Sequence, residues 1–408
     1  MLSRRKLLKQ ISSVPLVGSI IGGTTLTASA NTASQILRRD YFKELGVRTF
    51  INAAGTYTSM TGSLMPEEVL QSIQYASNDY VNLDELQEKV GARIASLVKC
   101  EDAMVTSGAA SAITFGTAGV VAGMNNDNVV QIPHLEGTDM KSEVIMQNAH
   151  QIGYAHAIRN TGAHIVYVDT RKELEKAINE KTAMMFFLNA NANRGQIGHE
   201  EWLEVAQKNG IPTMNDCAAD VPPVENLWKY TQMGFDLVCF SGGKGIRGPQ
   251  SAGLLLGKKN LIQAARLHAP PRGNTVGRGM KVNKEEVLGM MVALERYVHK
   301  DHEAEWKMWE KQIAHIADTV KDIDGVTTDI YVPDIANHVP TLKIAWDDKK
   351  ISHTNDSFHE AMRSGHPSIE VAGWGSDNSI QITTWMLIPG QERVVAERVK
   401  EVINKAQV

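Results

Sequence analysis

The sequence predicts an α/β protein built around a large, mostly parallel β-sheet. Short apolar runs alternate with helical segments through much of the 408-residue chain, and such alternation gives parallel β-α-β units with right-handed crossovers. Many of the 33 glycines flank the apolar runs, where tight strand–helix turns require them. The hydrophobic fraction of 43% and the charged fraction of 22% exclude a disordered chain, a collagen and a small disulfide scaffold.

The first thirty residues are predicted to be an export signal. Four basic residues between positions 4 and 9 precede a mildly apolar stretch over 11–23, and residues 28–30 read Ala-Ser-Ala, like a cleavage site. The start S-R-R-K-L-L-K matches the bacterial twin-arginine pattern. We therefore expect a periplasmic or otherwise exported protein, with the twin-arginine export machinery as a partner. A short membrane anchor is the alternative, although the stretch is too short for a stable span.

The large domain is expected to cover residues 31–270, after a short leader. Helical periodicity covers 67–98 in two pieces that meet near Asn82, and a small, apolar helix covers 108–122. The expected strands cover 128–132, 144–146, 164–168, 183–188, 212–214, 237–240 and 251–256, and helices cover 154–161, 171–178 and 199–209.

The pattern changes near the proline-rich segment 269–274, which predicts a second, smaller α+β domain over 271–408. It contains amphipathic helices at 284–300 and 302–320, strands at 341–346 and 379–385, and a last helix at 391–406.

Charge and cysteine content exclude other functions. Lys and Arg total 42 and Asp and Glu 46, with no long basic run, so we expect no nucleic-acid partner. The three cysteines, Cys100, Cys217 and Cys239, are an odd number that argues against a disulfide framework. The motifs C-x-x-C and H-E-x-x-H are absent, so we expect no metal site.

Two small-residue segments follow predicted strands and could bind charged groups. Ser107, Gly108 and Ala109 open a helix, where free N–H groups and the helix dipole favour a phosphate; an ordinary buried helix start is the alternative. Asp216 ends a short strand and is followed by the small residue Ala218. A buried carboxylate at a strand end needs a cationic partner, unless it is simply a helix N-cap.

A third segment places a lysine in a glycine-rich loop after an apolar strand. Ser241, Gly242 and Gly243 precede Lys244, and a lysine with a depressed pKa can form a Schiff base with an aldehyde cofactor. A nucleotide phosphate loop is the alternative, but its lysine is followed by Ser or Thr, whereas Lys244 is followed by glycine. Together the three segments predict a site for pyridoxal 5′-phosphate (PLP). In it, Lys244 would hold the aldehyde, Asp216 the pyridine nitrogen and the segment 107–109 the phosphate.

With these motifs the sequence resembles the fold-type-I PLP enzymes, and among them selenocysteine synthase (L-seryl-tRNA selenium transferase) and its ammonia-lyase relatives. The matching segments are I-N-A-A-G-T at 51–56, L-Q-E-K-V-G at 86–91, D-C-A-A at 216–219, S-G-G-K at 241–244, G-P-Q at 248–250 and G-R-G-M-K-V-N-K-E-E at 277–286. The tRNA-binding N-terminal domain of selenocysteine synthase has no counterpart here, so selenium transfer to tRNA is not expected.

The resemblance implies the aspartate aminotransferase fold, with Lys244 as the Schiff-base lysine and Asp216 as the partner of the pyridine nitrogen. It also implies a site at a homodimer interface. We expect an α,β-eliminating lyase of the ammonia-lyase type that acts on a small amine such as an amino acid. A β-replacement transferase, an aminotransferase, a racemase and an aldolase remain alternatives, as does a non-catalytic scaffold. The expected cofactor-binding residues are Ser107, Gly108, Ala109, Asp216, Ala218, Ser241, Gly243 and Lys244.

Further candidates lie outside these motifs. By analogy with the fold type, His150 is expected to stack on the cofactor ring or relay a proton, unless it is an ordinary core residue; Tyr154 is a further candidate. Thr56 and Tyr57 are expected at the site entrance as substrate-binding residues. Two arginines complete the expected substrate-binding set, Arg272 and Arg278. Arginines suit an anionic group, within one chain or across a dimer interface; the alternative is that both are solvated linker charges.

Overall fold

The computed structural model describes residues 39–408, so the predicted export signal lies outside the described residues. The chain divides into two units, and the boundary along the sequence falls between Thr49 and Phe50. The described part of the first unit contains one short helix, α3 (Tyr41–Glu44), whose N-cap Asp40 accepts a hydrogen bond from the backbone N–H of Lys43. The second unit contains the remaining described elements.

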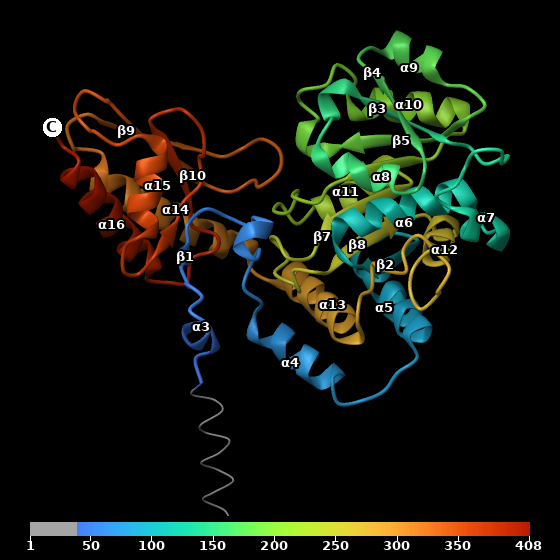
Figure 1. The fold of residues 1–408 in the computed structure, drawn as a ribbon, viewed down its shortest axis with the longest axis horizontal. Helices are drawn as coiled ribbons and strands as arrows, with labels where there is room; N and C mark the ends of the chain where they lie inside the picture. The colour runs from blue at the N-terminus through green and yellow to red at the C-terminus, as the bar shows by residue number, and fades with distance from the viewer. Residues whose placement is uncertain (1–38) are drawn as a thin grey trace, which may run out of the picture. The chain divides into compact units, whose positions relative to one another are not determined.

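A seven-stranded sheet forms the largest layer of the second unit (Figure 1). Adjacent strands of this sheet pair in parallel, except that β8 is antiparallel to both of its neighbours, β2 and β7. The expected α/β fold with a mostly parallel sheet is therefore confirmed. In spatial order the strands are β2 (Asp102–Thr106), β8 (Gly253–Gly257), β7 (Leu237–Ser241), β6 (Thr213–Asp216), β5 (Thr182–Leu188), β3 (Glu143–Gln147) and β4 (His164–Val168).

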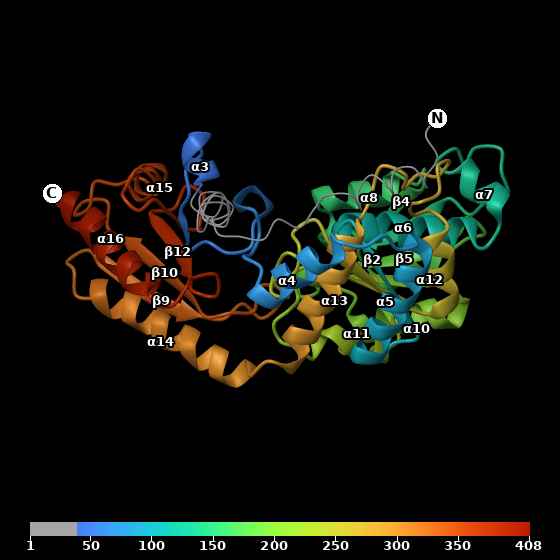
Figure 2. The ribbon, with the colours of Figure 1, turned by 90° about the horizontal axis from the view of Figure 1, so that it is seen from below.

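Helices cover both faces of this sheet, and Figure 2 shows α6 and α8 on one side and α10 and α11 on the other. Successive residues of each strand enter the two cores alternately: Met104 packs with one helix layer, and Ala103 and Val105 pack with the other. The first layer contains α6 (Gly108–Ala122), α8 (His156–Arg159) and α12 (Lys259–Arg266). The second contains α4 (Glu67–Ala76), α5 (Leu83–Val98), α9 (Arg171–Ala177), α10 (His199–Asn209), α11 (Asn226–Met233) and α13 (Lys284–His299).

A smaller antiparallel sheet, ordered β12-β10-β9, packs with the C-terminal helices around a separate core. Its elements are α14 (His302–Val320), β9 (Val326–Tyr331), β10 (Thr341–Trp346), α15 (Asn355–Arg363), β12 (Ser379–Thr383) and α16 (Gln391–Lys405). The N-terminal strand β1 (Ile51–Asn52) pairs in parallel with β11 (Ile369–Glu370) beside this core. The division of the chain at residues 270 and 271 stays a prediction.

The expected strand over 128–132 is wrong, because this segment is helical. Helix α7 (Asn126–Gln131) begins at Asn125, whose side chain accepts hydrogen bonds from the backbone N–H groups of Asp127 and Asn128. Two adjacent valines gave the segment its β-type composition, but the N-cap stabilises a helix instead. The sequence patterns also did not predict β2, β9 and α15.

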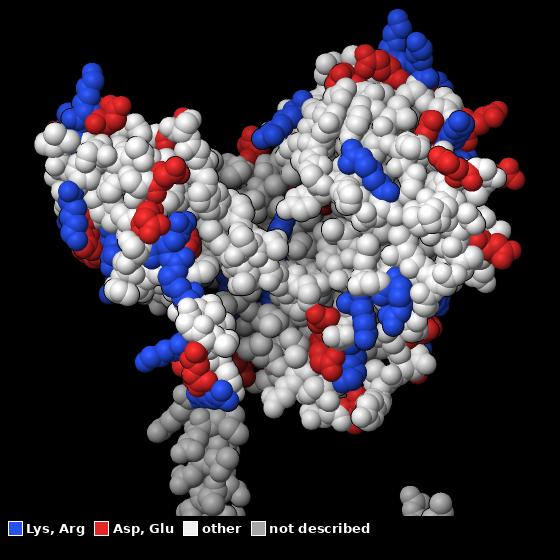
Figure 3. All heavy atoms as spheres, viewed as in Figure 1, with Lys and Arg blue, Asp and Glu red and all other residues white. Residues whose placement is uncertain are grey.

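Charged side chains of both signs are mixed on the surface of the molecule. Figure 3 shows acidic and basic side chains interspersed over the visible face, so neither sign of charge predominates there.

None of the helices between residues 39 and 408 is long and apolar enough to cross a membrane.

Candidate active site

The predicted cofactor segments meet at one edge of the large sheet. Gly253, the first residue of β8, pairs with Thr106 at the end of β2 and with Ser241 at the end of β7. The parallel strand β6 ends at Asp216 at the same edge. The segments that follow these strands contain the start of α6, Ala218 and Lys244. The sheet topology therefore brings together residues that lie far apart in the sequence.

Lys244 lies between two cavities, of about 390 and 360 Å³, and lines both. Thr56 also lines both, and Ser241 and Gly243 line the smaller one. The loop requires glycine at position 243, because a Cβ atom there would lie 2.5 Å from the Cα atom of Gln250. The side chain of Lys244 is only partly exposed.

Burial lowers the pKa of the Lys244 ammonium, although the nearby carboxylates of Asp216 and Asp220 oppose this effect. A lowered pKa increases the fraction of neutral amine, which is the form that attacks an aldehyde or accepts a proton. Among the residues described, Lys244 has no hydrogen-bond or ion-pair partner that would hold its nitrogen away from a ligand.

Asp216 is a buried carboxylate with only weak partners in the chain. One carboxylate oxygen accepts hydrogen bonds from the backbone N–H of Ala218 at 3.0 Å and from Sγ of Cys239 at 3.5 Å. Burial raises its pKa, whereas the Ala218 N–H and the charge of Lys244 lower it. A carboxylate that is only 4% exposed favours a cation beside it, and a protonated pyridine nitrogen is such a cation. The site therefore fits the ring of PLP.

The start of α6 fits the phosphate of this cofactor. Gly108 has a φ of +82°, and a Cβ atom on Gly253 would lie 2.5 Å from the carbonyl carbon of Gly108, so both positions require glycine. Ser107, Gly108 and Ala109 are partly exposed there, and Ser251, which lines the smaller cavity, lies next to Gly108. The first N–H groups of this 15-residue helix can bind an anion.

His150 lies outside both cavities. It is fully buried, and its Nδ1 accepts a hydrogen bond from the backbone N–H of Leu188 at 3.2 Å. Burial lowers the pKa of its imidazole to about 4, so the ring is neutral at pH 7. Its expected catalytic role stays a prediction, since the structure places the ring against Phe187 in the core.

The other candidates divide into two groups. Thr56, Tyr57 and Tyr154 line the larger cavity, as expected for residues at the site. Arg272 donates hydrogen bonds to Asp84 and to a backbone carbonyl, and Arg278 is exposed. Neither arginine lines a cavity beside Lys244, so within one chain the structure does not bring them to the site.

A buried polar network beside Asp216 was missed from the sequence. Asn189 donates hydrogen bonds to Asp220 at 2.7 Å and to the hydroxyl of Tyr230 at 2.8 Å, and its carbonyl oxygen lies 2.8 Å from Nε2 of His199. The second carboxylate oxygen of Asp220 has no hydrogen-bond partner in the described chain. The sequence feature that could have indicated this network is Asp220, the second aspartate of the segment D-C-A-A-D, four residues after Asp216.

The pH dependence of stability should report on Asp220. Burial raises the pKa of its carboxyl group to about 7, so the folded chain keeps a proton that the unfolded chain loses near pH 4. The free energy of unfolding of the cofactor-free protein therefore falls as the pH rises from 4 to 7. At about 1.4 kcal/mol per pKa unit, the free energy of unfolding of the wild type should fall by about 2–3 kcal/mol between pH 5 and 8. We expect this fall to be absent from the Asp220→Asn protein. Urea unfolding at both pH values measures this difference.

The exposed Asp348 provides the control, because Asp348→Asn should leave the pH dependence of unfolding as in the wild type. An Asp220→Asn protein with the wild-type pH dependence would show that Asp220 is ionised in the fold at acid pH.

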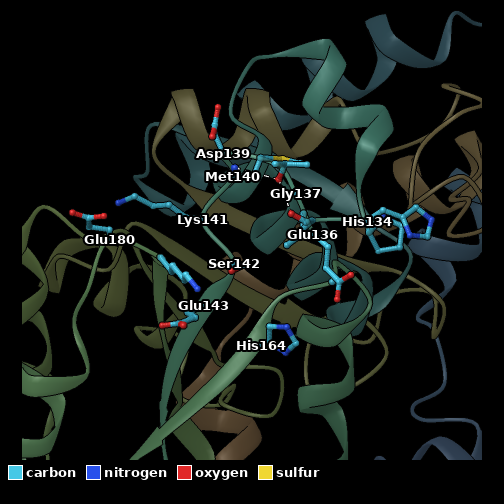
Figure 4. A pocket seen from close by; sticks show the side chains of 15 residues that line it. His134, Glu136, Gly137, Asp139, Met140, Lys141, Ser142, Glu143, His164 and Glu180 are labelled. Atoms are coloured by element: carbon cyan, nitrogen blue, oxygen red, sulfur yellow. Dashed lines mark hydrogen bonds between the residues drawn. The ribbon is translucent and has the colours of Figure 1, made fainter.

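A further cavity, of about 720 Å³, lies at the amino ends of β3 and β4, and Figure 4 shows the side chains that line it. Glu143 and His164, the first residues of β3 and β4, line it together with the loop over 133–142. None of the predicted site residues lines this cavity. Among the described residues, no group of His, Cys, Asp and Glu is arranged to hold a metal ion.

Comparisons with known proteins identify relatives of this chain. Residues 50–323 match the profile of SelA, L-seryl-tRNA selenium transferase. The D-glucosaminate-6-phosphate ammonia lyase of Salmonella typhimurium is 28% identical over 90% of this chain and 98% of its own length. A 5′-C-glycyluridine monooxygenase-decarboxylase of a Streptomyces species is 24% identical over 89% of this chain and 92% of its own length.

Solved structures support the same fold. A structure of D-glucosaminate-6-phosphate ammonia-lyase has a TM-score of 0.79 and 26% identity, and it covers 90% of this chain and 99% of that one. A structure titled SPT with PLP internal aldimine has a TM-score of 0.57 and 12% identity, over 92% of this chain and 98% of that one. The second likeness concerns the fold alone.

Proposed function

The chain belongs to the L-seryl-tRNA selenium transferase family of PLP-dependent enzymes, and on that premise we propose that it is an α,β-eliminating lyase of the ammonia-lyase type. Its substrate is a small amino acid with a hydroxyl group on the β-carbon. The observation that carries this proposal is the partly buried Lys244, which lines both cavities and lies close enough to the buried carboxylate of Asp216 for the two charges to influence each other. The similarity to a relative named as an ammonia lyase supports the reaction type.

The chain's own residues can hold and move the protons of this reaction. PLP, when bound, supplies an aldehyde for the substrate amine and a ring that takes up the electron pair left at the α-carbon. The neutral amine of Lys244 then accepts the α-proton and returns a proton to the departing β-hydroxyl group, which leaves as water. The carboxylate of Asp216 keeps the ring nitrogen protonated throughout.

The atoms balance over the complete reaction. One water leaves the β-carbon, and one water later releases the amino group, so a β-hydroxy amino acid gives ammonia and a 2-oxo acid. No oxidant or reductant is needed. The first N–H groups of α6 hold the phosphate, so the aldehyde stays within reach of Lys244.

Product analysis with D and L forms of β-hydroxy amino acids tests this proposal. We expect equal amounts of ammonia and 2-oxo acid, with rates that depend on added PLP. Exchange of the α-proton with inversion but without ammonia would replace the lyase by a racemase. Amino-group transfer to an added oxo acid would replace it by an aminotransferase.

We also propose that the enzyme is exported through the twin-arginine machinery and acts as a homodimer. The basic start and the Ala-Ser-Ala segment before residue 31 support export. Arg272 and Arg278 lie away from the Lys244 cavities within one chain, so a role at the site requires a partner subunit. Cell fractionation of an Arg4→Lys, Arg5→Lys variant tests the export, and sedimentation of the holoenzyme tests the assembly.

A further inference from the structure

The larger cavity beside Lys244 is lined by neutral side chains. Of the residues that line it within 39–408, Lys244 is the one that carries a charge. The others include hydroxyl and amide groups from both parts of the fold, such as those of Thr56, Asn337 and Gln381. Three tyrosine rings, of Tyr57, Tyr154 and Tyr331, also line it. The cavity therefore offers many hydrogen bonds but no arginine for an anionic group.

Two buried polar atoms in this lining have no hydrogen-bond partner in the described chain. They are Nε1 of Trp385 and Oγ1 of Thr383, whose residues are 3% and 8% exposed. An unpaired buried donor costs free energy, and native proteins rarely leave one unsatisfied. Both residues line the cavity, so a ligand in it is the natural partner for both atoms.

Gly55 shows that the two atoms lie near each other. A Cβ atom built on Gly55 would lie 3.5 Å from Nε1 of Trp385 and 3.8 Å from Oγ1 of Thr383. Both donors are therefore next to the same backbone position, which also lines the cavity. An indole N–H can only donate and a threonine hydroxyl can donate, so the group that satisfies both is a hydrogen-bond acceptor.

The surroundings fix both donors in place. Trp385 is buried against Trp309 and Val339, and its backbone carbonyl accepts a hydrogen bond from Arg247. Thr383 is the last residue of β12, and its backbone N–H donates to the carbonyl of Ala53 at 2.9 Å. Rigid donors bind an acceptor with little loss of conformational entropy.

We propose that Trp385 and Thr383 bind the substrate carboxylate through neutral hydrogen bonds, and that the cavity accepts an amino acid whose side chain is uncharged and hydroxylated. This inference rests on the proposed function, because it names the substrate class of the same site. Two donors suffice for one carboxylate. Within one chain, a phosphate or a second carboxylate in this cavity would have no cationic partner of its own, because Lys244, the one charged residue of the lining, is engaged at the reacting carbon.

The substrate class in this proposal differs from the phosphorylated sugar acid in the name of the similar ammonia lyase. The neutral lining favours the unphosphorylated counterpart of such a compound. Hydroxyl groups can pair with Thr56, Asn337 and Gln381, and the C–H faces of a carbon chain can pack on the tyrosine rings.

Equilibrium titration of the holoenzyme tests the proposal through the absorbance of its cofactor, which reports binding even without turnover. The probes are matched pairs: D-glucosaminate and its 6-phosphate, serine and O-phosphoserine, and threonine and aspartate, each amino-acid pair in both D and L forms. We expect the uncharged member of a pair to bind with a Kd at least about tenfold lower than its charged counterpart. Equal or tighter binding of the charged members, or no binding of any uncharged member, overturns the proposal.

Two variants test the anchor itself. Thr383→Val and Trp385→Phe each remove one donor, and we expect each to raise the Kd of the preferred substrate about tenfold without changing the absorbance of the substrate-free holoenzyme. Thr383→Ser restores the hydroxyl and should restore binding. Trp306→Phe removes an indole N–H that bonds Glu310 and should leave the Kd unchanged.

An unchanged Kd in both donor variants overturns the anchor. An altered spectrum of a substrate-free variant places that residue at the cofactor and also overturns its assignment. Selective binding without release of ammonia contradicts only the proposed elimination, so the two failures are distinguishable.

Discussion

Replacing Lys244 by alanine is expected to lower turnover on the order of 10³-fold or more, and to remove the covalent bond between protein and cofactor. The substitution deletes both the amine that captures the aldehyde and the base that accepts the α-proton. The side-chain ammonium of Lys244 has no hydrogen-bond partner within the described chain, and alanine keeps the backbone carbonyl that accepts a hydrogen bond from the N–H of Arg247, so the fold should persist. The absorbance spectrum and kcat of the PLP-supplemented variant measure both effects.

The exposed Lys259 at the start of α12 provides the matched control. Lys259→Ala removes a lysine of the same domain without touching either cavity, and its spectrum and kcat should equal those of the wild type. A Lys244→Ala protein that keeps the wild-type spectrum and turnover would remove the basis for the proposed chemistry. In that case a scaffold role on the same fold would be favoured.

Replacing Asp216 by asparagine is expected to lower kcat by about 10²–10³-fold, the usual effect of removing one preorganised electrostatic group. Asparagine has nearly the same shape and can still accept the hydrogen bond from the backbone N–H of Ala218. It cannot, however, hold a proton on the pyridine nitrogen by charge. The bond to Lys244 should therefore form while α-proton removal slows, which a deuterium-exchange measurement resolves.

Asp220 is the appropriate comparison, since it is the other buried carboxylate close to Lys244. Asp220→Asn should lower kcat less than tenfold, because this residue bonds Asn189 and not the ring. A reversed order of effects, with Asp220→Asn the more damaging, would mean that the pyridine nitrogen faces Asp220 instead of Asp216.

The site segments that are continuous in the sequence were the predictable ones. Gly108 has a φ of +82°, which favours glycine, and Gly243 stands where a close contact with the backbone of Gln250 leaves no room for a side chain. Lys244 follows Gly243 in the same loop. These requirements are local, so they leave a motif in the chain. Most of the large sheet could be predicted for the same reason, because most of its buried strands are short apolar runs, whereas β2 begins with Asp102 and ends with Thr106 and was missed.

The residues that reasoning from the sequence missed depend on long-range packing. Asn189 and Asp220 lie 31 positions apart and meet only because β5 and β6 are adjacent. Trp385 and Thr383 reach the Lys244 cavity from the small sheet, and no local pattern distinguishes them from core residues. The role expected for His150 from its position after β3 stays a prediction, and the burial of its ring is a feature that the sequence did not reveal.

Borohydride reduction of the PLP-loaded protein, followed by peptide mapping, identifies the lysine that holds the cofactor. We expect one pyridoxyl group, located on Lys244 and absent from the Lys244→Ala protein. A modified lysine at any other position, or no modification at all, would contradict this expectation.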